Sequence, residues 1–304
     1  MISRRSMIHT LAASVAAAAA RPLAALAQAA TITRPIPSSG ERLPVVGLGS
    51  WITFNVGDDS ELRDECAAVM GAFFAAGGRL IDSSPMYGSS QDVIGYGLIK
   101  LARPNGVFSA DKVWISSGSR GPEQIEESRE RWGVRRFDLL QVHNLLAWED
   151  HLPVLLAMKS AGRVRYVGIT TSEGRRHAEV EKIIASRPID FVQVTYNPVD
   201  REVEDRILPL AQERGIAVII NRPFQEGALI RRLQRHSLPS WVGETGAGSW
   251  AQFILKFIAS HPAVTCTIPA TSQVAHVKEN MGAATGQLPD PAMRRRMAAY
   301  VSAL

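Results

Sequence analysis

Short apolar runs rich in Val and Ile alternate with amphipathic stretches along most of the chain. The runs predict eight strands, at 45–51, 80–84, 113–118, 139–144, 164–171, 191–197, 217–223 and 264–270. Apolar positions recur at helical spacing near 60–76, 91–101, 122–132, 150–160, 175–186, 201–214, 249–259, 273–283 and 291–303. Strands that alternate with helices pair in parallel, and eight such units favour a closed (β/α)8 TIM barrel.

Turn residues support this division of the chain. Gly77-Gly78, Gly162 and Gly215 each precede a predicted strand, where they are expected to end the helix before it. Residues 31–43 predict a hairpin that closes the bottom of the barrel. Residues 224–248 form a long connection after the seventh strand, and such loops usually serve substrate or cofactor. No Gly-rich dinucleotide fingerprint follows the first strand, which argues against an open doubly wound sheet.

The first thirty residues have the order of an export signal. Arg4-Arg5 precedes an alanine-rich apolar run that is too short to span a bilayer, and Ala25-Leu26-Ala27 is a small-x-small cleavage site. We expect a twin-arginine signal peptide over 1–30 and one barrel domain over 31–304. The alternative is a soluble N-terminal helix in a cytoplasmic protein. The signal predicts a periplasmic protein whose partner is the twin-arginine export machinery and which keeps no stable membrane anchor.

Charge and cysteine content bear on whether the protein binds nucleic acid and whether it holds a disulfide. The formal net charge is +5, and the three arginines of residues 1–30 account for all but +2 of it. A nearly balanced domain without a basic stripe gives no reason to expect nucleic acid. Cys66 lies on an apolar helical face and Cys266 lies in a strand-like run, so two separate buried thiols are favoured over a disulfide. We expect no metal site.

Three polar residues suited to acid–base chemistry lie at or just after the ends of predicted strands. Asp82 ends one strand, Tyr87 follows in the next loop, and His143 ends another strand. Such ends converge on one mouth of a barrel. There a tyrosine can protonate a carbonyl oxygen as hydride arrives, and a histidine can orient the carbonyl. Each residue alone has a structural explanation, as a helix cap, a packing ring or a buried imidazole, but the three together favour catalysis.

The segment around Asp82 resembles the signature of the aldo-keto reductases. The resemblance rests on Ile81-Asp82-Ser83-Ser84-Pro85-Met86-Tyr87-Gly88 and on segments 47–51, 141–143, 163–171 and 268–280, so it extends over 31–285. It implies NADP(H) bound across the barrel mouth, a small carbonyl substrate, and Tyr87 as proton donor beside Asp82 and His143. It also implies two groups of cofactor contacts: Thr170, Thr171 and Gln193 at the nicotinamide amide, and Thr271, Ser272, His276, Glu279 and Asn280 near the adenosine phosphate and adenine.

One departure from the family pattern concerns a lysine. If residues 113–118 are the third strand, Gly118 stands where the family has a lysine that lowers the pKa of the tyrosine and pairs with the aspartate. Asp82 would then lack a counter-charge, and Tyr87 would be a poorer proton relay. Arg120 is the nearest replacement in sequence, although a solvated loop cation is the more ordinary role for it.

Other departures concern the cofactor. Asn221 stands where the family usually has the aromatic residue that stacks on the nicotinamide, and Arg222 and Phe224 follow it as further cofactor contacts. Ala270 and His276 stand where NADP-selective members often carry cations. Because a 2′-phosphate prefers Arg or Lys, the choice between NADP and NAD stays open, with Arg231, Arg232 and Arg235 able to compensate.

The sequence supports two functions of different classes. The first is an exported NAD(P)(H)-dependent oxidoreductase that acts on an aldehyde, a ketone or a sugar-like alcohol. The second is a barrel derived from such reductases that binds a nucleotide or small ligand without turnover. A lysine-independent elimination or isomerisation with the cofactor retained is a third hypothesis.

Trp51, Phe54 and Trp148 are the candidate substrate-pocket residues, and Trp241 is a further one.

Overall fold

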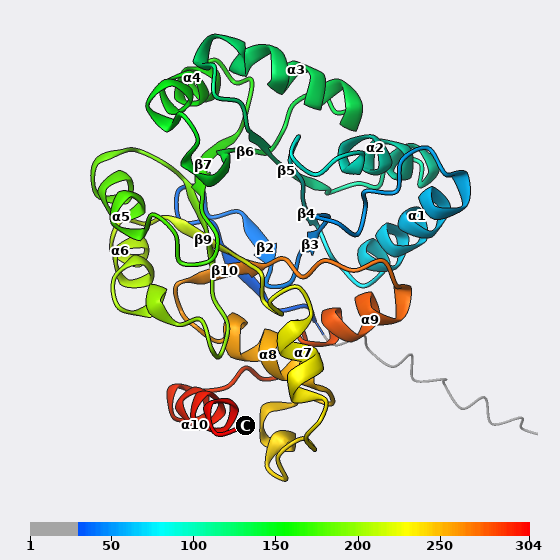
Figure 1. Ribbon diagram of the computed structural model, residues 1–304, viewed down its shortest axis with the longest axis vertical. Helices are drawn as coiled ribbons and strands as arrows, with labels where there is room; N and C mark the ends of the chain where they lie inside the picture. Colours follow the sequence, from blue (N-terminus) through cyan, green and yellow to red (C-terminus); the bar gives the residue numbers. More distant parts are fainter. Residues whose placement is uncertain (1–29) are drawn as a thin grey trace, which may run out of the picture.

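The computed structural model describes residues 30–304, which fold around an eight-stranded parallel barrel (Figure 1). The predicted signal peptide therefore lies almost entirely outside the described residues. Neighbouring strands follow the chain order from β3 to β10 and pair in parallel. The barrel strands are β3 (Leu48–Gly49), β4 (Leu80–Asp82), β5 (Phe108–Val113), β6 (Leu139–Val142), β7 (Tyr166–Thr170), β8 (Phe191–Thr195), β9 (Ala217–Asn221) and β10 (Val264–Thr267). This confirms the predicted barrel.

Two glycines allow the barrel to close between its first and last strands. Bridges between Val46 and Thr267 and between Gly49 and Ala270 complete the ring. A Cβ atom on Gly47 would lie 2.9 Å from the backbone oxygen of Leu80 on β4 and 3.1 Å from Cys266 Sγ on β10, and one on Gly49 would lie 2.7 Å from the backbone oxygen of Ile268. Side chains at either position would force the strands apart, so the close approach requires glycine.

Helices surround the barrel and bury their apolar faces against it (Figure 1). They are α1 (Ser60–Ala75), α2 (Ser90–Lys100), α3 (Gly121–Trp132), α4 (Trp148–Ser160), α5 (His177–Ser186), α6 (Ile207–Glu213), α7 (Ala228–Leu233), α8 (Trp250–Ala259), α9 (Val274–Gly282) and α10 (Pro291–Ser302). Among the described residues no helix is long and apolar enough to cross a membrane. Cys66 and Cys266 are both buried and free, as expected.

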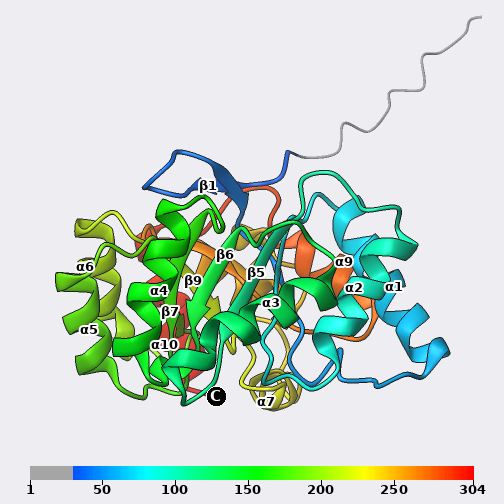
Figure 2. The same cartoon turned by 90° about the horizontal axis from the view of Figure 1, so that it is seen from above.

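The predicted hairpin closes one end of the barrel. It consists of β1 (Thr33–Pro35) and β2 (Arg42–Pro44), and its Ile36 and Leu43 join the cluster of apolar side chains inside the barrel. The Tyr166 hydroxyl inside the barrel reaches Ser39 of the hairpin turn at 2.7 Å. Figure 2 shows the hairpin at one end of the barrel and α7 at the other. The chemistry must therefore lie at the end that α7 borders.

The third strand is the element that the sequence pattern misplaced, and α7, within the connection expected at 224–248, is a helix that the pattern missed. The strand was expected at 113–118, but β5 runs from Phe108 to Val113 and ends where it was expected to begin. Residues 118–120 instead form a short 3-10 helix that leads into α3. The apolar run Val113-Trp114-Ile115 suggested a strand, whereas β5 itself contains three polar residues, Ser109, Asp111 and Lys112, which hid it. The misplacement bears directly on the active site.

Candidate active site

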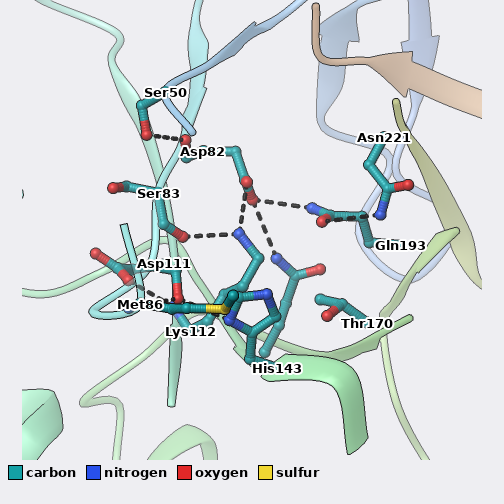
Figure 3. A network of polar contacts seen from close by, with 12 residues as sticks. Ser50, Asp82, Ser83, Met86, Asp111, Lys112, His143, Thr170, Gln193 and Asn221 are labelled. Carbon is teal, nitrogen blue, oxygen red and sulfur yellow. Dashed lines mark hydrogen bonds and ion pairs between the residues drawn. The ribbon is translucent and has the colours of Figure 1, made fainter. Parts of the chain in front are cut away.

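A buried ion pair lies at the centre of the barrel mouth (Figure 3). Asp82 at the end of β4 and Lys112 on β5 are almost wholly inaccessible to solvent. The Lys112 Nζ donates to Asp82 Oδ2 at 2.5 Å and to the backbone oxygen of Ser83 at 2.7 Å. The expectation that Asp82 lacks a counter-charge is therefore wrong, because Lys112 supplies it from the strand that the sequence pattern misplaced.

Gly118 lies away from this ion pair. It begins the 3-10 helix after β5, and a Cβ atom there would lie 2.6 Å from the Cβ of Asp150 on α4. The glycine is thus explained by close packing against α4 and not by the loss of a catalytic lysine. Arg120 is exposed and pairs with Glu123, which confirms the ordinary role of a solvated loop cation.

Amide and hydroxyl groups complete the surroundings of Asp82. Its Oδ1 accepts a hydrogen bond from Gln193 Nε2 at 2.9 Å and a longer one from Gln141 Nε2 at 3.4 Å. Ser50 Oγ donates to the backbone oxygen of Asp82 at 2.8 Å. Both carboxylate oxygens are therefore engaged by donors. A buried carboxylate held in this way is fixed in position.

Tyr87 lies above the Lys112 ammonium, which is 5.0 Å from the centre of the phenol ring. Burial raises the pKa of Tyr87, the Lys112 charge opposes that rise, and the net shift is upward. For Lys112, burial alone would lower the pKa, but Asp82 and Tyr87 outweigh it and raise the pKa. At neutral pH the phenol therefore holds its proton beside an ammonium that stabilises the phenolate left when that proton departs.

His143 borders the same space from the end of β6. Its ring lies edge-on to that of Tyr87, with the two centres 5.6 Å apart. Its Nδ1 lies 2.7 Å from Ser84 Oγ. Burial and then the Lys112 charge lower the pKa of His143 well below its usual value, so the imidazole is neutral at physiological pH. Asp82, Tyr87 and His143 are thus brought together as expected, with Lys112 as a fourth member.

A cavity of about 650 Å³ opens from this group across the mouth. Most of the expected cofactor residues line it, and so does one of the expected substrate residues. These residues are Trp51, Thr170, Gln193, Asn221, Arg222, Phe224, Thr271, His276, Glu279 and Asn280. A cavity of this size suits a ligand larger than a simple aldehyde.

Five of the residues expected at the cofactor or the substrate do not line the cavity, and neither do Arg232 and Arg235. Thr171 turns its hydroxyl to the backbone oxygen of Arg175 at 2.6 Å, and Ser272 is exposed outside the cavity. Phe54 is fully buried in the apolar core. Trp148 is buried in α4, where its indole donates to Glu179, and Trp241 packs against Phe253. The assignment of Phe54, Trp148 and Trp241 to the substrate pocket is therefore wrong, because apolar packing holds all three elsewhere.

Asn221 lines the cavity with a side-chain amide at the position where the family usually has an aromatic ring. Its Nδ2 donates to the backbone oxygen of Thr171 at 2.9 Å, and its Oδ1 accepts from Thr195 Oγ1 at 2.7 Å. The next residue, Arg222, lies 6.0 Å from the centre of the Trp51 ring and pairs with Glu173 at 3.2 Å. Asn221 thus ties β9 to β7 and β8, while Arg222 spans the cavity rim toward Trp51.

The lining of the cavity fits a nicotinamide dinucleotide. Side-chain amides of Gln193 and Asn221 can bind a carboxamide, and the guanidinium groups of Arg222 and Arg231 match the charge of a pyrophosphate. Trp51 and Phe224 add apolar surface. Within residues 30–304 no group of three or more His, Cys, Asp or Glu side chains could hold a metal ion.

Comparison with known proteins agrees with this geometry. The model of the aldo/keto reductase family matches residues 45–300. The chain belongs to the aldo/keto reductase family. It is similar to the methylglyoxal reductase YeaE of Escherichia coli, with 27% identity over 245 residues that cover 78% of this chain and 84% of the relative. It is also similar to an NADH-specific methylglyoxal reductase of Escherichia coli, with 26% identity, covering 67% of this chain and 71% of the relative.

Solved structures of the aldo/keto reductase family share the fold. An aldo/keto reductase from Klebsiella pneumoniae in complex with NADP and acetate superimposes with a TM-score of 0.73 at 21% identity, covering 86% of this chain and 93% of that one. The thermostable aldo-keto reductase Tm1743, in complex with the inhibitor epalrestat, gives a TM-score of 0.74 at 24% identity, covering 88% and 99%.

Two residues of this aldo/keto reductase site were missed in the sequence. Lys112 was hidden because its strand was misplaced, although the signal was present: a lysine within a strand that pairs with the Asp82 strand on one side and the His143 strand on the other. Ser84 lies within the motif that carried the resemblance, yet serine at that position gave no separate signal. Its contact with His143 joins residues 59 positions apart and appears only in the fold.

Proposed function

We propose that the protein is an NAD(P)(H)-dependent oxidoreductase that interconverts a small aldehyde or ketone, sugar-like substrates included, with the matching alcohol. One observation carries this proposal: the buried Lys112 ammonium lies between the Asp82 carboxylate and the Tyr87 ring. The non-catalytic alternative rested on Gly118 and Asn221, and Lys112 beside Asp82 removes the first of these two supports. The relatives named as methylglyoxal reductases and the structure that binds NADP support the reaction class.

Each residue has a separate part in the proposed reduction. Bound NAD(P)H would supply the hydride to the carbonyl carbon. Tyr87 gives its phenolic proton to the carbonyl oxygen, and the Lys112 ammonium stabilises the phenolate that remains. Asp82 keeps Lys112 charged and fixed in position. His143, which is neutral, orients the carbonyl oxygen toward Tyr87. In the oxidation direction the same phenolate accepts the proton of the alcohol.

The experiment measures carbonyl reduction by the purified protein with NADH and with NADPH, using methylglyoxal and a panel of other aldehydes and ketones. Both cofactors are tested because the residues expected near the adenosine phosphate include no Lys or Arg to pair with a 2′-phosphate. These residues are Thr271, His276, Glu279 and Asn280. Arg231, which also lines the cavity, could pair with that phosphate. Tyr87→Phe should lower kcat by roughly 10²- to 10⁴-fold, since it removes the proton donor. Its cofactor affinity, followed by nicotinamide fluorescence, should change little.

Tyr96→Phe is the matched control because Tyr96 is on α2, outside the cavity, where its hydroxyl binds Asp64. This variant should keep wild-type activity. Full activity in Tyr87→Phe would refute the assigned proton donor. Tight cofactor binding without reduction of any carbonyl would favour the binding barrel instead.

We also propose that residues 1–30 are a twin-arginine signal and that the enzyme acts in the periplasm. The support is the order of Arg4-Arg5, an apolar run and a small-x-small cleavage site. Free nicotinamide cofactor should be scarce outside the cytoplasm, so export of the folded protein with its cofactor already bound suits this assignment.

A further inference from the structure

Ser84 makes a buried contact that the proposed mechanism does not use. Its Oγ lies 2.7 Å from His143 Nδ1, and both side chains are buried. Ser84 follows β4 and is two residues from Asp82, whereas His143 follows β6 (Figure 3 shows His143 near the Asp82–Lys112 pair). The Ser84 hydroxyl therefore links the ends of β4 and β6. It contacts the His143 ring at Nδ1, which leaves Nε2 as the other ring nitrogen.

Counting protons gives the direction of this hydrogen bond. The Ser84 oxygen also accepts the backbone N–H of Met86 at 3.2 Å. Within residues 30–304 these two contacts are the hydrogen bonds that the hydroxyl makes. A serine hydroxyl carries one proton and two lone pairs, so Met86 N–H occupies one lone pair and cannot receive the proton. Of the two partners only His143 Nδ1 can accept the proton, because a ring that donated instead would leave the buried Ser84 O–H without an acceptor among the described residues.

We propose that Ser84 is a positioning residue that holds His143 in the tautomer protonated on Nε2, with Nε2–H free to donate to the substrate's carbonyl oxygen. A neutral imidazole has one N–H, so an Nδ1 that accepts from Ser84 leaves that proton on Nε2. The opposite tautomer would turn an Nε2 lone pair toward the lone pairs of the carbonyl oxygen. The catalytic role of this tautomer rests on the proposed function, whereas the tautomer itself follows from the hydrogen bonds of Ser84.

The direct test is ¹⁵N NMR of the histidine rings in the purified full chain, without substrate. The His143 signals are assigned by their loss in His143→Gln. Between pH 6 and 8, wild-type His143 should show Nδ1 as an unprotonated acceptor and Nε2 as protonated. Ser84→Ala removes the donor, so His143 should become a mixture of both neutral tautomers. Ser109→Ala is the matched control, because it removes a buried serine hydroxyl that binds Asp138 at the far end of the barrel.

Activity supplies a second readout. Ser84→Ala should lower kcat about 10-fold, the effect of one lost hydrogen bond in the transition state, with KM within about twofold of wild type. Ser84→Thr keeps the hydroxyl and should restore the tautomer together with most of kcat. Ser109→Ala should change neither the His143 signals nor kcat.

Two results would overturn the inference. One is a wild-type His143 protonated on Nδ1, which would make Ser84 the acceptor. The other is a Ser84→Ala protein whose His143 signals match those of wild type. Failure of the proposed function looks different: the tautomer and its loss in Ser84→Ala would be as described, but no carbonyl would be reduced by wild type.

Discussion

Lys112 and Asp82 form a buried ion pair in which each charge depends on the other. Both charges are withdrawn from water, and each is balanced by the other and by donors or acceptors of fixed position. Such a pair adds little net stability compared with an apolar pair of the same size, but removal of one partner leaves a buried charge uncompensated. In the proposed reduction, the pair supplies the cation beside Tyr87.

Lys112→Met should therefore abolish carbonyl reduction and lower the free energy of unfolding by about 3–5 kcal/mol, because it strands the Asp82 carboxylate. The double variant Asp82→Asn/Lys112→Met removes both charges and should regain most of that stability without regaining activity. Urea denaturation and nicotinamide oxidation measure the two effects separately.

Lys100→Met is the control for this pair. It breaks the exposed pair between Lys100 and Asp64, so the free energy of unfolding should change far less than in Lys112→Met. A Lys112→Met protein as stable as the double variant would show that Asp82 needs no charged partner.

Single residues of the site differ in how far their sequence revealed them. Asp82, Tyr87 and His143 are at or near ends of correctly placed strands, so their convergence followed from barrel geometry. Trp148 and Phe54 were misjudged because an aromatic side chain in a loop or helix serves packing as readily as a pocket, and local sequence does not say which way it turns. The contact between Ser84 and His143 depends on two loops, and no local pattern encodes it.

At the scale of elements, β5 is the strand that the sequence pattern misplaced, and its polar residues explain why. A barrel strand is buried on both faces, so polar residues within it mark a site or a buried network and not a solvent face. Lys112 points toward Asp82 inside the mouth, while the adjacent Asp111 contacts Gln91 of α2 on the other face. The other seven strands carry mostly apolar residues, and their predicted runs overlap the observed strands. The pattern thus predicts elements well where burial is purely apolar.

Asp111 joins β5 to α2 through a wholly buried carboxylate. Its Oδ2 accepts from Gln91 Nε2 at 2.9 Å and its Oδ1 from the backbone N–H of Lys112 at 2.7 Å. Burial outweighs these bonds and raises the pKa of Asp111 from 3.8 to about 7. Between these two values the folded protein binds more protons than the unfolded chain. The contribution of Asp111 to stability therefore falls as pH rises from about 4 to about 7.

Asp111→Asn should remove this dependence. Relative to wild type, the variant should gain on the order of 3 kcal/mol in unfolding free energy between pH 5 and pH 8. Denaturant unfolding at the two pH values measures the difference. Asp92→Asn, a change of an exposed carboxylate on the same helix as Gln91, should leave the slope unchanged. Equal slopes in Asp111→Asn and wild type would show that Asp111 is ionised at pH 5.

At the scale of the whole molecule, the cavity depends on the closed barrel. Its lining comes from the ends of β3, β4, β7, β8 and β9, from residues that follow β6 and β10, and from α7, α8 and α9, which are distant in sequence. A partly folded chain therefore has no cofactor site, and a bound cofactor stabilises only the folded state. These properties suit a route of export that carries folded proteins.

The full chain, expressed in a bacterium with a twin-arginine translocase, should reach the periplasm without its first residues and with nicotinamide nucleotide bound. Arg4→Lys/Arg5→Lys should leave it at full length in the cytoplasm, because the export receptor reads the arginine pair. Fractionation, N-terminal sequencing and mass spectrometry of the bound nucleotide measure these outcomes, and a strain without the translocase is the control. Cleaved periplasmic protein without bound nucleotide would show that export does not require prior binding of the cofactor. Wild-type protein that stays uncleaved in the cytoplasm would mean that residues 1–30 are no export signal.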